Sequence, residues 1–224
     1  MDRQSTRVNL GGVSVFSAEA SAIVREWWPD GLTQSFPDQE LEKLIDDTEA
    51  SIVDGDEYPL ERLFEKIRSP RPTTVCNPKK EDLASHSQLL FLHDYWEARR
   101  DGKDLPLSST IDAIDLVPAM GYMMLLEPVN QGEDFIYRVY GTQIARHSRV
   151  EMTGRRVRDI PVALVAVYFL ATYRAAQRMR QPIFAHHATH SSIQVAEWDR
   201  LILPFANQEG IVDRLLVGNI PNVR

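Results

Sequence analysis

The chain has 224 residues, 43% hydrophobic and 25% charged, so it is long enough to bury a core without disulfide bonds. Its formal net charge of −7 disfavours general nucleic-acid binding, because proteins that bind DNA or RNA usually carry a basic excess. The single cysteine, Cys76, excludes an intrachain disulfide and favours a reducing compartment. No apolar run reaches the roughly 18 residues that span a bilayer and no signal peptide is recognisable, so we expect a cytoplasmic protein with no membrane span.

The acidic residues are concentrated in the N-terminal third. Residues 1–75 carry 15 acidic and 8 basic residues, whereas residues 76–224 carry 17 of each. A short hairpin or extended arm is expected at residues 7–16. Helical spacing of apolar residues then predicts helices at 18–28, 38–52 and 58–68. Residues 69–82 contain three prolines and are the predicted linker. We therefore divide the chain into an acidic helical region, residues 1–80, and a second domain, residues 81–224.

The second domain changes from helical to strand periodicity along its length. A leading helix is predicted at residues 87–100, and a loop at 106–118 follows it. Strands at 122–129 and 135–140 form a hairpin. Short helices at 142–147 and 155–160 precede the longest helix, 162–180, and strands at 182–190, 196–205 and 211–219 complete the order. Strand runs on both sides of a helical block predict an α+β fold, with an antiparallel sheet that has helices on one face.

Five short motifs occur in this domain in a fixed order. They are W-x-x-x-R at residues 96–100, F-x-Y-R-x-x-G-T at 135–142, T-G-R at 153–155, R-L-x-L-P at 200–204 and V-D-R-L-L at 212–216. Over about residues 87–219 the chain thereby resembles the PAS-like family that is common in alphaproteobacterial proteins. Within these motifs, Gly141 is expected to let the chain leave the sheet sharply, and Thr142 to cap the next helix. These motif residues are explained by folding and need no chemical role.

The resemblance implies a sensory or regulatory protein of bacterial signalling that binds a small molecule, a partner protein, or both. The chain ends at Arg224, just past the last predicted strand, so we expect no output domain. We find no catalytic residues, so we expect no enzyme. The implied partners are a second copy, joined through the leading helix as a homodimer, and an unidentified signalling protein. The alternative is a ligand-free scaffold for protein interactions.

A ligand pocket is also implied by the resemblance, since the sheet and the long helix of a PAS-type fold enclose a small cavity. Aromatic residues in such places more often fill a core than hold a cofactor. The segment before the long helix lacks the cysteine of flavin-photosensing relatives, and the long helix lacks a histidine for haem. The cofactor therefore stays unknown. The residues that can line the pocket are Tyr137, Tyr168, Phe184, Leu201, Leu203 and Leu216.

His186, His187 and His190 form an H-H-x-x-H cluster on a predicted strand. On a strand His186 and His190 share a face but stand about 13 Å apart, at a rise of roughly 3.3 Å per residue, while His187 points the other way. We therefore predict no metal site. A metal-dependent enzyme that uses the His186 region is the less favoured alternative.

Five arginines crowd the segment after the first hairpin, with only Glu151 and Asp159 to offset them. They can form a surface for an anion or a partner. The R-x-x-D pattern at residues 156–159 occurs in some cyclic-dinucleotide sites, but we favour a solvated basic face, or salt bridges to the acidic N-terminal helices. The arginines are Arg146, Arg149, Arg155, Arg156 and Arg158.

Overall fold

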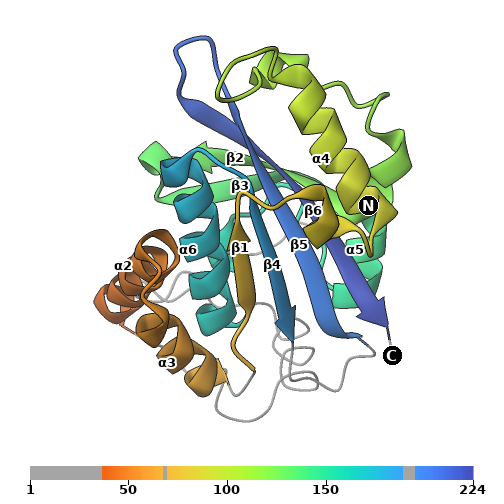
Figure 1. The fold of residues 1–224 in the computed structure, drawn as a ribbon. Helices are drawn as coiled ribbons and strands as arrows, with labels where there is room; N and C mark the ends of the chain where they lie inside the picture. The colour runs from red at the N-terminus through yellow and green to blue at the C-terminus, as the bar shows by residue number, and fades with distance from the viewer. Residues whose placement is uncertain (1–36, 68–69, 189–194, 224) are drawn as a thin grey trace, which may run out of the picture.

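A single antiparallel sheet forms the centre of the computed structural model, which describes residues 37–67, 70–188 and 195–223. The hairpin expected at 7–16 and the helix expected at 18–28 lie outside the described residues. Six strands follow one another across the sheet in the order β1-β4-β5-β6-β2-β3 (Figure 1). They are β1 (Thr73–Cys76), β2 (Met123–Val129), β3 (Asp134–Tyr140), β4 (Ile183–Ala188), β5 (Val195–Ala206) and β6 (Val212–Val223).

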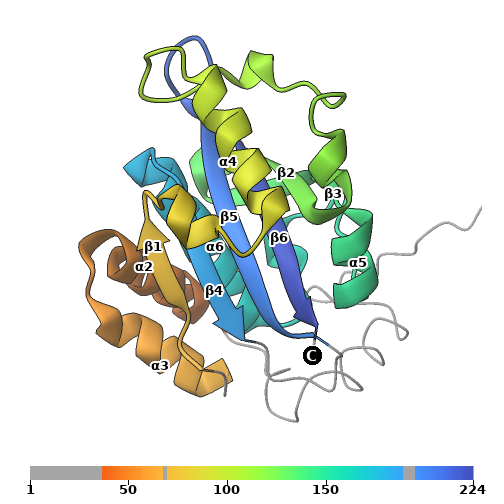
Figure 2. The ribbon, with the colours of Figure 1, turned by 45° about the vertical axis from the view of Figure 1, so that its right-hand side comes forward.

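Helices cover the sheet on both of its faces (Figures 1 and 2). The longest helix of the second domain, α6 (Ala163–Met179), covers one face. The helices α2 (Asp38–Asp54) and α3 (Glu57–Ile67) pack on α6. The leading helix, α4 (Ser87–Arg99), covers the other face. The predicted α+β class and antiparallel sheet are confirmed, and α4 is the exception to the expectation that the helices share one face. Shorter segments are α5 (Thr142–Ser148), η1 (Lys80–Leu83), η2 (Ser108–Thr110), η3 (Val117–Tyr122), η4 (Asn130–Gly132) and η5 (Val157–Asp159).

Side-chain alternation along β5 separates the two faces. Arg200 points to the face under α6, where its guanidinium carbon is 3.7 Å from the centroid of the Phe169 ring. The next residue, Leu201, points to the opposite face and pairs across the sheet with Gly218. A Cβ built on Gly218 would lie only 2.5 Å from Cδ2 of Leu89 on α4. The helix α4 therefore rests directly on the backbone of β6.

The expected linker is wrong for residues 73–76, which form β1 and pair antiparallel with β4. This stretch is Thr-Thr-Val-Cys, and its β-branched residues favour a strand, while the prolines around it are tolerated because β1 is at the sheet edge. Ile45, Leu63 and Phe64 of α2 and α3 belong to the same hydrophobic core as the sheet. The described part of the N-terminal region is thus packed within the core of the second domain.

The helix expected at 155–160 is shorter in the structure and is preceded by a turn that closes the edge of β3. Gly154 donates its N–H to the carbonyl of Tyr137 at 2.7 Å, and Tyr137 donates to the carbonyl of Arg155 at 3.0 Å. Gly154 has φ +77°, a left-handed conformation that glycine adopts without strain. The T-G-R motif is therefore a turn that supplies edge hydrogen bonds to β3. Within the described ranges, no helix is both long and apolar enough to cross a membrane.

Candidate functional site

A buried arginine lies between the sheet and α6. Arg200 is only 4% exposed, although it sits in the middle of β5. Its Nε donates a hydrogen bond of 3.2 Å to Oδ1 of Asn219, its neighbour on β6, while Nη1 is buried without any acceptor. The guanidinium lies over the ring of Phe169 and is 5.9 Å from the ring centroid of Tyr173. Both rings come from α6, so the helix and the sheet hold the guanidinium between them.

Further buried polar atoms around Arg200 have no hydrogen-bond partner. They are the hydroxyls of Tyr168 and Tyr173 on α6 and Nδ1 of His187 on β4. The Tyr173 hydroxyl lies near that of Tyr137, and the Tyr168 hydroxyl near that of Thr172, close enough to affect the pKa of the phenols but without the geometry of a hydrogen bond. The His187 ring is 5.7 Å from the Tyr168 ring, measured between centroids. Native proteins satisfy nearly all of their buried polar groups, so several unpaired atoms in one place need an explanation. Tyr137 and Tyr140 of β3 adjoin this group: their ring centroids are 5.2 Å apart, and the charge of Arg200 acts to lower the pKa of both phenols. We name the whole set the Arg200 cluster; its members are Arg200, Tyr137, Tyr140, Tyr168, Tyr173 and His187.

The cluster carries one positive charge at neutral pH. Burial raises the pKa of Tyr140 and of Tyr168 to about 12, even though the charge of Arg200 partly opposes this rise. Burial also lowers the pKa of the His187 imidazole well below its usual range, and the charge of Arg200 lowers it further. The phenols of Tyr140 and Tyr168 and the imidazole of His187 are therefore neutral at that pH. Among the described residues, no carboxylate forms a salt bridge with Arg200.

The structure brings together only part of the predicted pocket. Tyr137 and Tyr168 are members of the Arg200 cluster. Leu201 and Leu203 follow Arg200 at odd spacings on β5, so their side chains point to the face under α4. Phe184 and Leu216 are their register partners, opposite Leu201 and Leu203 respectively, and lie on that same face. These four residues therefore lie on the other face of the sheet and are not brought to the cluster.

The sequence interpretation missed four members of the cluster: Arg200, Tyr140, Tyr173 and His187. Arg200 was assigned only to a motif with a folding role. Its signal in the sequence is a charged residue in the middle of a predicted strand, directly before the apolar residues 201–205. A charged residue at such a position is either exposed or buried with a specific interaction. The apolar residues that point to both faces of the sheet favour burial. His187 was correctly predicted to point away from His186.

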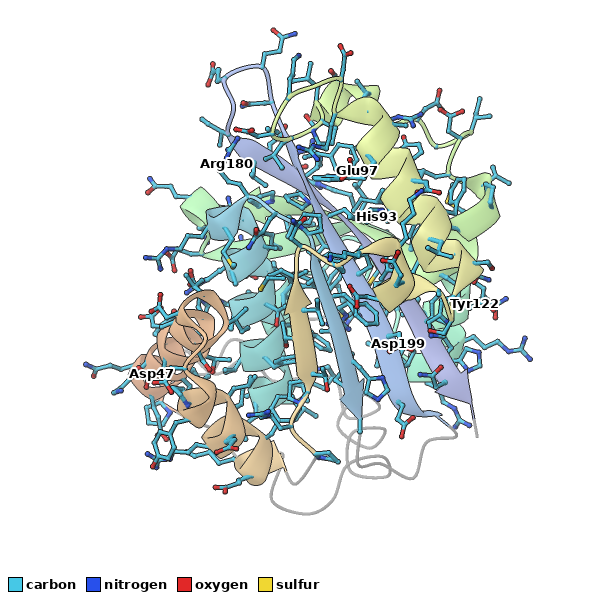
Figure 3. The ribbon with its side chains drawn as sticks, viewed as in Figure 1. Asp47, His93, Glu97, Tyr122, Arg180 and Asp199 are labelled. Atoms are coloured by element: carbon cyan, nitrogen blue, oxygen red, sulfur yellow. The ribbon has the colours of Figure 1, made fainter. Side chains whose placement is uncertain are left out.

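A second polar group lies on the face under α4, around Asp199, which Figure 3 labels. Its Oδ1 contacts Nδ1 of His186 at 2.7 Å, and its Oδ2 contacts Nε2 of His86 and accepts a 2.9 Å hydrogen bond from Asn222. His86 immediately precedes α4, so this carboxylate joins the start of that helix to β4 and β6. His190 lies outside the described residues. In the part of the chain that the structure describes, no three metal-binding side chains are arranged to hold an ion.

Replacing Asp199 with asparagine is expected to lower the free energy of unfolding by about 2 kcal/mol at pH 7. Burial alone would raise the pKa of Asp199, but hydrogen bonds from Asn222, His186 and His86 lower it below its usual 3.8. This stabilisation is complete above pH 3.8 and is lost as the pH falls through the lower, folded-state pKa. Urea unfolding should therefore show that the two proteins differ by a constant amount above pH 3.8 and converge in stability over the interval below it. A constant difference over that interval would contradict the assignment, and Asp94→Asn, on exposed α4 surface, is the control.

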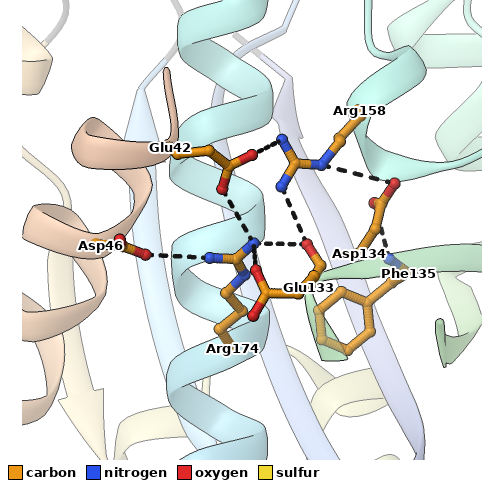
Figure 4. Close-up of polar contacts among 7 residues, drawn as sticks. All are labelled: Glu42, Asp46, Glu133, Asp134, Phe135, Arg158 and Arg174. Atoms are coloured by element: carbon orange, nitrogen blue, oxygen red, sulfur yellow. Dashed lines mark hydrogen bonds and ion pairs between the residues drawn. The ribbon is translucent and has the colours of Figure 1, made fainter. Parts of the chain in front are cut away.

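Ion pairs connect α2 to α6 (Figure 4). Arg174 of α6 is 7% exposed and contacts Glu133 Oε2 at 2.6 Å, Asp46 at 3.3 Å and Glu42 at 3.5 Å. Arg158 contacts Glu42 at 2.5 Å. It also donates to the backbone carbonyl of Glu133, which accepts from Arg174 as well. Two arginines and the acids of α2 thus form one network around the end of the β2–β3 hairpin.

The salt bridges expected between the five predicted arginines and the acidic helices are confirmed for Arg158. Arg155 and Arg156 lie on the turn that pairs with β3, Arg146 is in the last turn of α5, and Arg149 follows that helix. The acidic residues of α2 instead pair mainly with two arginines of α6, Arg174 and Arg178. The guanidinium of Arg178 lies 3.5 Å from the carboxylate of Glu49. The sequence showed the complementary charges, but it did not indicate that α6 would supply most of the basic partners.

The sheet, the long helix above it and the polar core between them define an α+β domain. A model of the PAS domain family matches residues 84–219, and the chain therefore belongs to the PAS domain family. This confirms the family resemblance and supports a sensory or regulatory role. No curated protein matches the chain.

Among solved structures, the chain is similar to one described as an RNA-binding light-oxygen-voltage receptor. The two are 13% identical and align with a TM-score of 0.37. The alignment covers 92% of this chain and 63% of the other, so the present chain spans less than two thirds of that structure.

Proposed function

We propose that the chain is a sensory PAS module, without enzymatic activity, whose signal is a small molecule bound at the Arg200 cluster. The supporting observation is the set of buried polar atoms that have no partner: Arg200 Nη1, the Tyr168 and Tyr173 hydroxyls, and His187 Nδ1. An unsatisfied buried group costs about 1–3 kcal/mol, so a molecule that pairs with several of them at once is bound with considerable gain. A core that served only for packing would gain stability from apolar residues at these positions.

The helix α6 connects the Arg200 cluster to the N-terminal region. Tyr168 of α6 is a member of the Arg200 cluster and also contacts Phe64 of α3 edge-on, with ring centroids 5.0 Å apart. Arg174, one residue after the cluster member Tyr173, holds α2. In our proposal a ligand that shifts α6 changes how α2 and α3 are held, and a partner protein reads that change.

A homodimer remains our expectation for the assembled protein. Leu89, Leu92 and Trp96 on the inner side of α4 are buried against the chain's own sheet. A second copy would therefore contact the outer side of α4, where Leu90 and Phe91 are half-buried. Static light scattering of the full chain measures this directly, and a monomeric mass across the working concentration range would remove the dimer from the proposal.

Native mass spectrometry of the freshly purified full chain tests ligand binding. We expect a mass above the 25.6 kDa of the polypeptide, and the excess should vanish after unfolding. A protein with no extra mass, and with a midpoint of thermal unfolding that low-molecular-mass cell extract leaves unchanged, would contradict ligand sensing. That result would favour the ligand-free scaffold.

A further inference from the structure

We infer that the molecule held at the Arg200 cluster is a small organic anion with a single carboxylate, bound by the Arg200 guanidinium. This inference rests on the proposed function and assigns the chemical class of the ligand.

The charge of the cluster is the first support. A guanidinium does not lose its proton in proteins, and Arg200 is nearly completely removed from water. A buried charge without a counter-charge is strongly unfavourable, and the face of the Phe169 ring compensates only part of it. Because the described residues supply no carboxylate to Arg200, a ligand with one negative charge completes the site.

The neutral members of the cluster are suited to the same ligand. The hydroxyls of Tyr168 and Tyr173 can each donate a hydrogen bond to a carboxylate oxygen. They cannot themselves neutralise the guanidinium. Among the described residues, Glu151 acts on the cluster through Tyr140, whose pKa its charge raises, but Glu151 is exposed and accepts hydrogen bonds from Thr153. The cluster therefore offers hydrogen-bond donors in excess of acceptors, as an anion requires.

The surroundings favour an organic acid over a phosphate. A guanidinium can bind two oxygens of either group side by side, so geometry alone does not separate them. A phosphate dianion would need a second cation, and the other strongly buried arginine among the described residues, Arg174, is already paired with acids. Aromatic rings continue from the cluster through Tyr173 to Phe135, whose centroids are 5.6 Å apart. These rings suit an apolar body attached to the carboxylate.

The experiment compares the full chain with Arg200→Gln, and with Arg214→Gln as the matched control. Arg214 is also on the sheet, but it is partly exposed and pairs with Glu127. Each protein is freshly purified and then unfolded, and the released molecule is identified by mass spectrometry. The stripped and refolded proteins are titrated with benzoate, phenylacetate and butyrate, with benzamide and inorganic phosphate as comparisons.

We expect the original chain and Arg214→Gln to release an organic acid that Arg200→Gln does not carry. At least one carboxylate should raise the midpoint of thermal unfolding of the original chain, with affinity weakened at least about tenfold in Arg200→Gln. Benzamide and phosphate should have no effect. Because Arg200→Gln removes an unpaired buried charge, the ligand-free variant should fold and be at least as stable as the original chain.

Three results would overturn the inference. A released molecule that is neutral, or an inorganic anion, would refute the organic acid but leave ligand sensing intact. Equal carboxylate binding by Arg200→Gln would place the anion elsewhere. The absence of any released molecule, together with no response to the probes, would refute both this inference and the proposed function.

Discussion

Replacing Trp96 with alanine is expected to lower the free energy of unfolding by about 4 kcal/mol. The Trp96 side chain is 2% exposed, and its Nε1 donates a 2.7 Å hydrogen bond to the carbonyl of Pro204 on β5. The alanine variant would leave a cavity between α4 and the sheet, together with a buried carbonyl that has lost its donor. Urea unfolding followed by circular dichroism measures the effect without relying on tryptophan fluorescence.

Two further variants separate the contributions. Trp96→Phe keeps an aromatic ring but loses the hydrogen bond, so we expect a loss of about 1–2 kcal/mol. Phe91→Ala, on the outer side of the same helix, should cost less than Trp96→Ala because Phe91 is only half-buried. A Trp96→Ala loss no larger than that of Phe91→Ala would show that α4 is not fastened to the sheet as described. The tryptophan of the W-x-x-x-R motif is therefore expected to anchor α4.

Replacing Gly141 with alanine is expected to cost about 3 kcal/mol, because the new methyl group would meet backbone and not a flexible side chain. The added Cβ would contact the Gly121 carbonyl oxygen and would lie 2.7 Å from the Gly121 carbonyl carbon and 2.8 Å from the Met123 carbonyl oxygen. Gly55→Ala is the control, since Gly55 has φ +75° but open space around it and should lose only about 1 kcal/mol. A smaller loss for Gly141→Ala than for Gly55→Ala would contradict this account.

The requirement for Gly141 differs from the one that the sequence suggested. Its φ of −60° and ψ of 135° are accessible to any residue, so conformational freedom does not explain the glycine. The close approach of two backbone segments explains why this position requires glycine. Thr142 was also expected to cap α5, but Gly141 occupies the N-cap position and no side chain caps this helix end. The motif was located correctly, whereas the physical reasons assigned to its two residues were wrong.

The parts of the fold that local patterns determine could be predicted. The hairpin, the long helix and the last three strands have apolar runs of the right length, separated by turn residues. The pocket could not be predicted in the same way, because Leu201, Ile202 and Leu203 are all apolar. A strand covered on both faces shows no alternation, so the sequence does not reveal which side chains point toward α6. The six pocket candidates were consequently drawn from both faces.

Long-range contacts could not be predicted from the sequence either. The acids of α2 and the arginines of the second domain were recognisable as complementary, but their pairing depends on how α2 is placed on α6. Arg174 and Asp46 are 128 positions apart in the chain, and no local pattern connects them. The edge strand β1 was missed because only four residues form it, between prolines that had indicated a linker.

The family model matches from residue 84 onward, but the packed structure also includes residues before that point. A chain cut there would expose the backbone edge of β4 that β1 now covers, and an open edge invites association with other strands. It would also leave Tyr168 without Phe64 and Arg174 without its partners on α2. The helices α2 and α3 therefore pack into the same hydrophobic core as the PAS domain, and we expect a fragment for biophysical work to keep this structure only if it begins before α2.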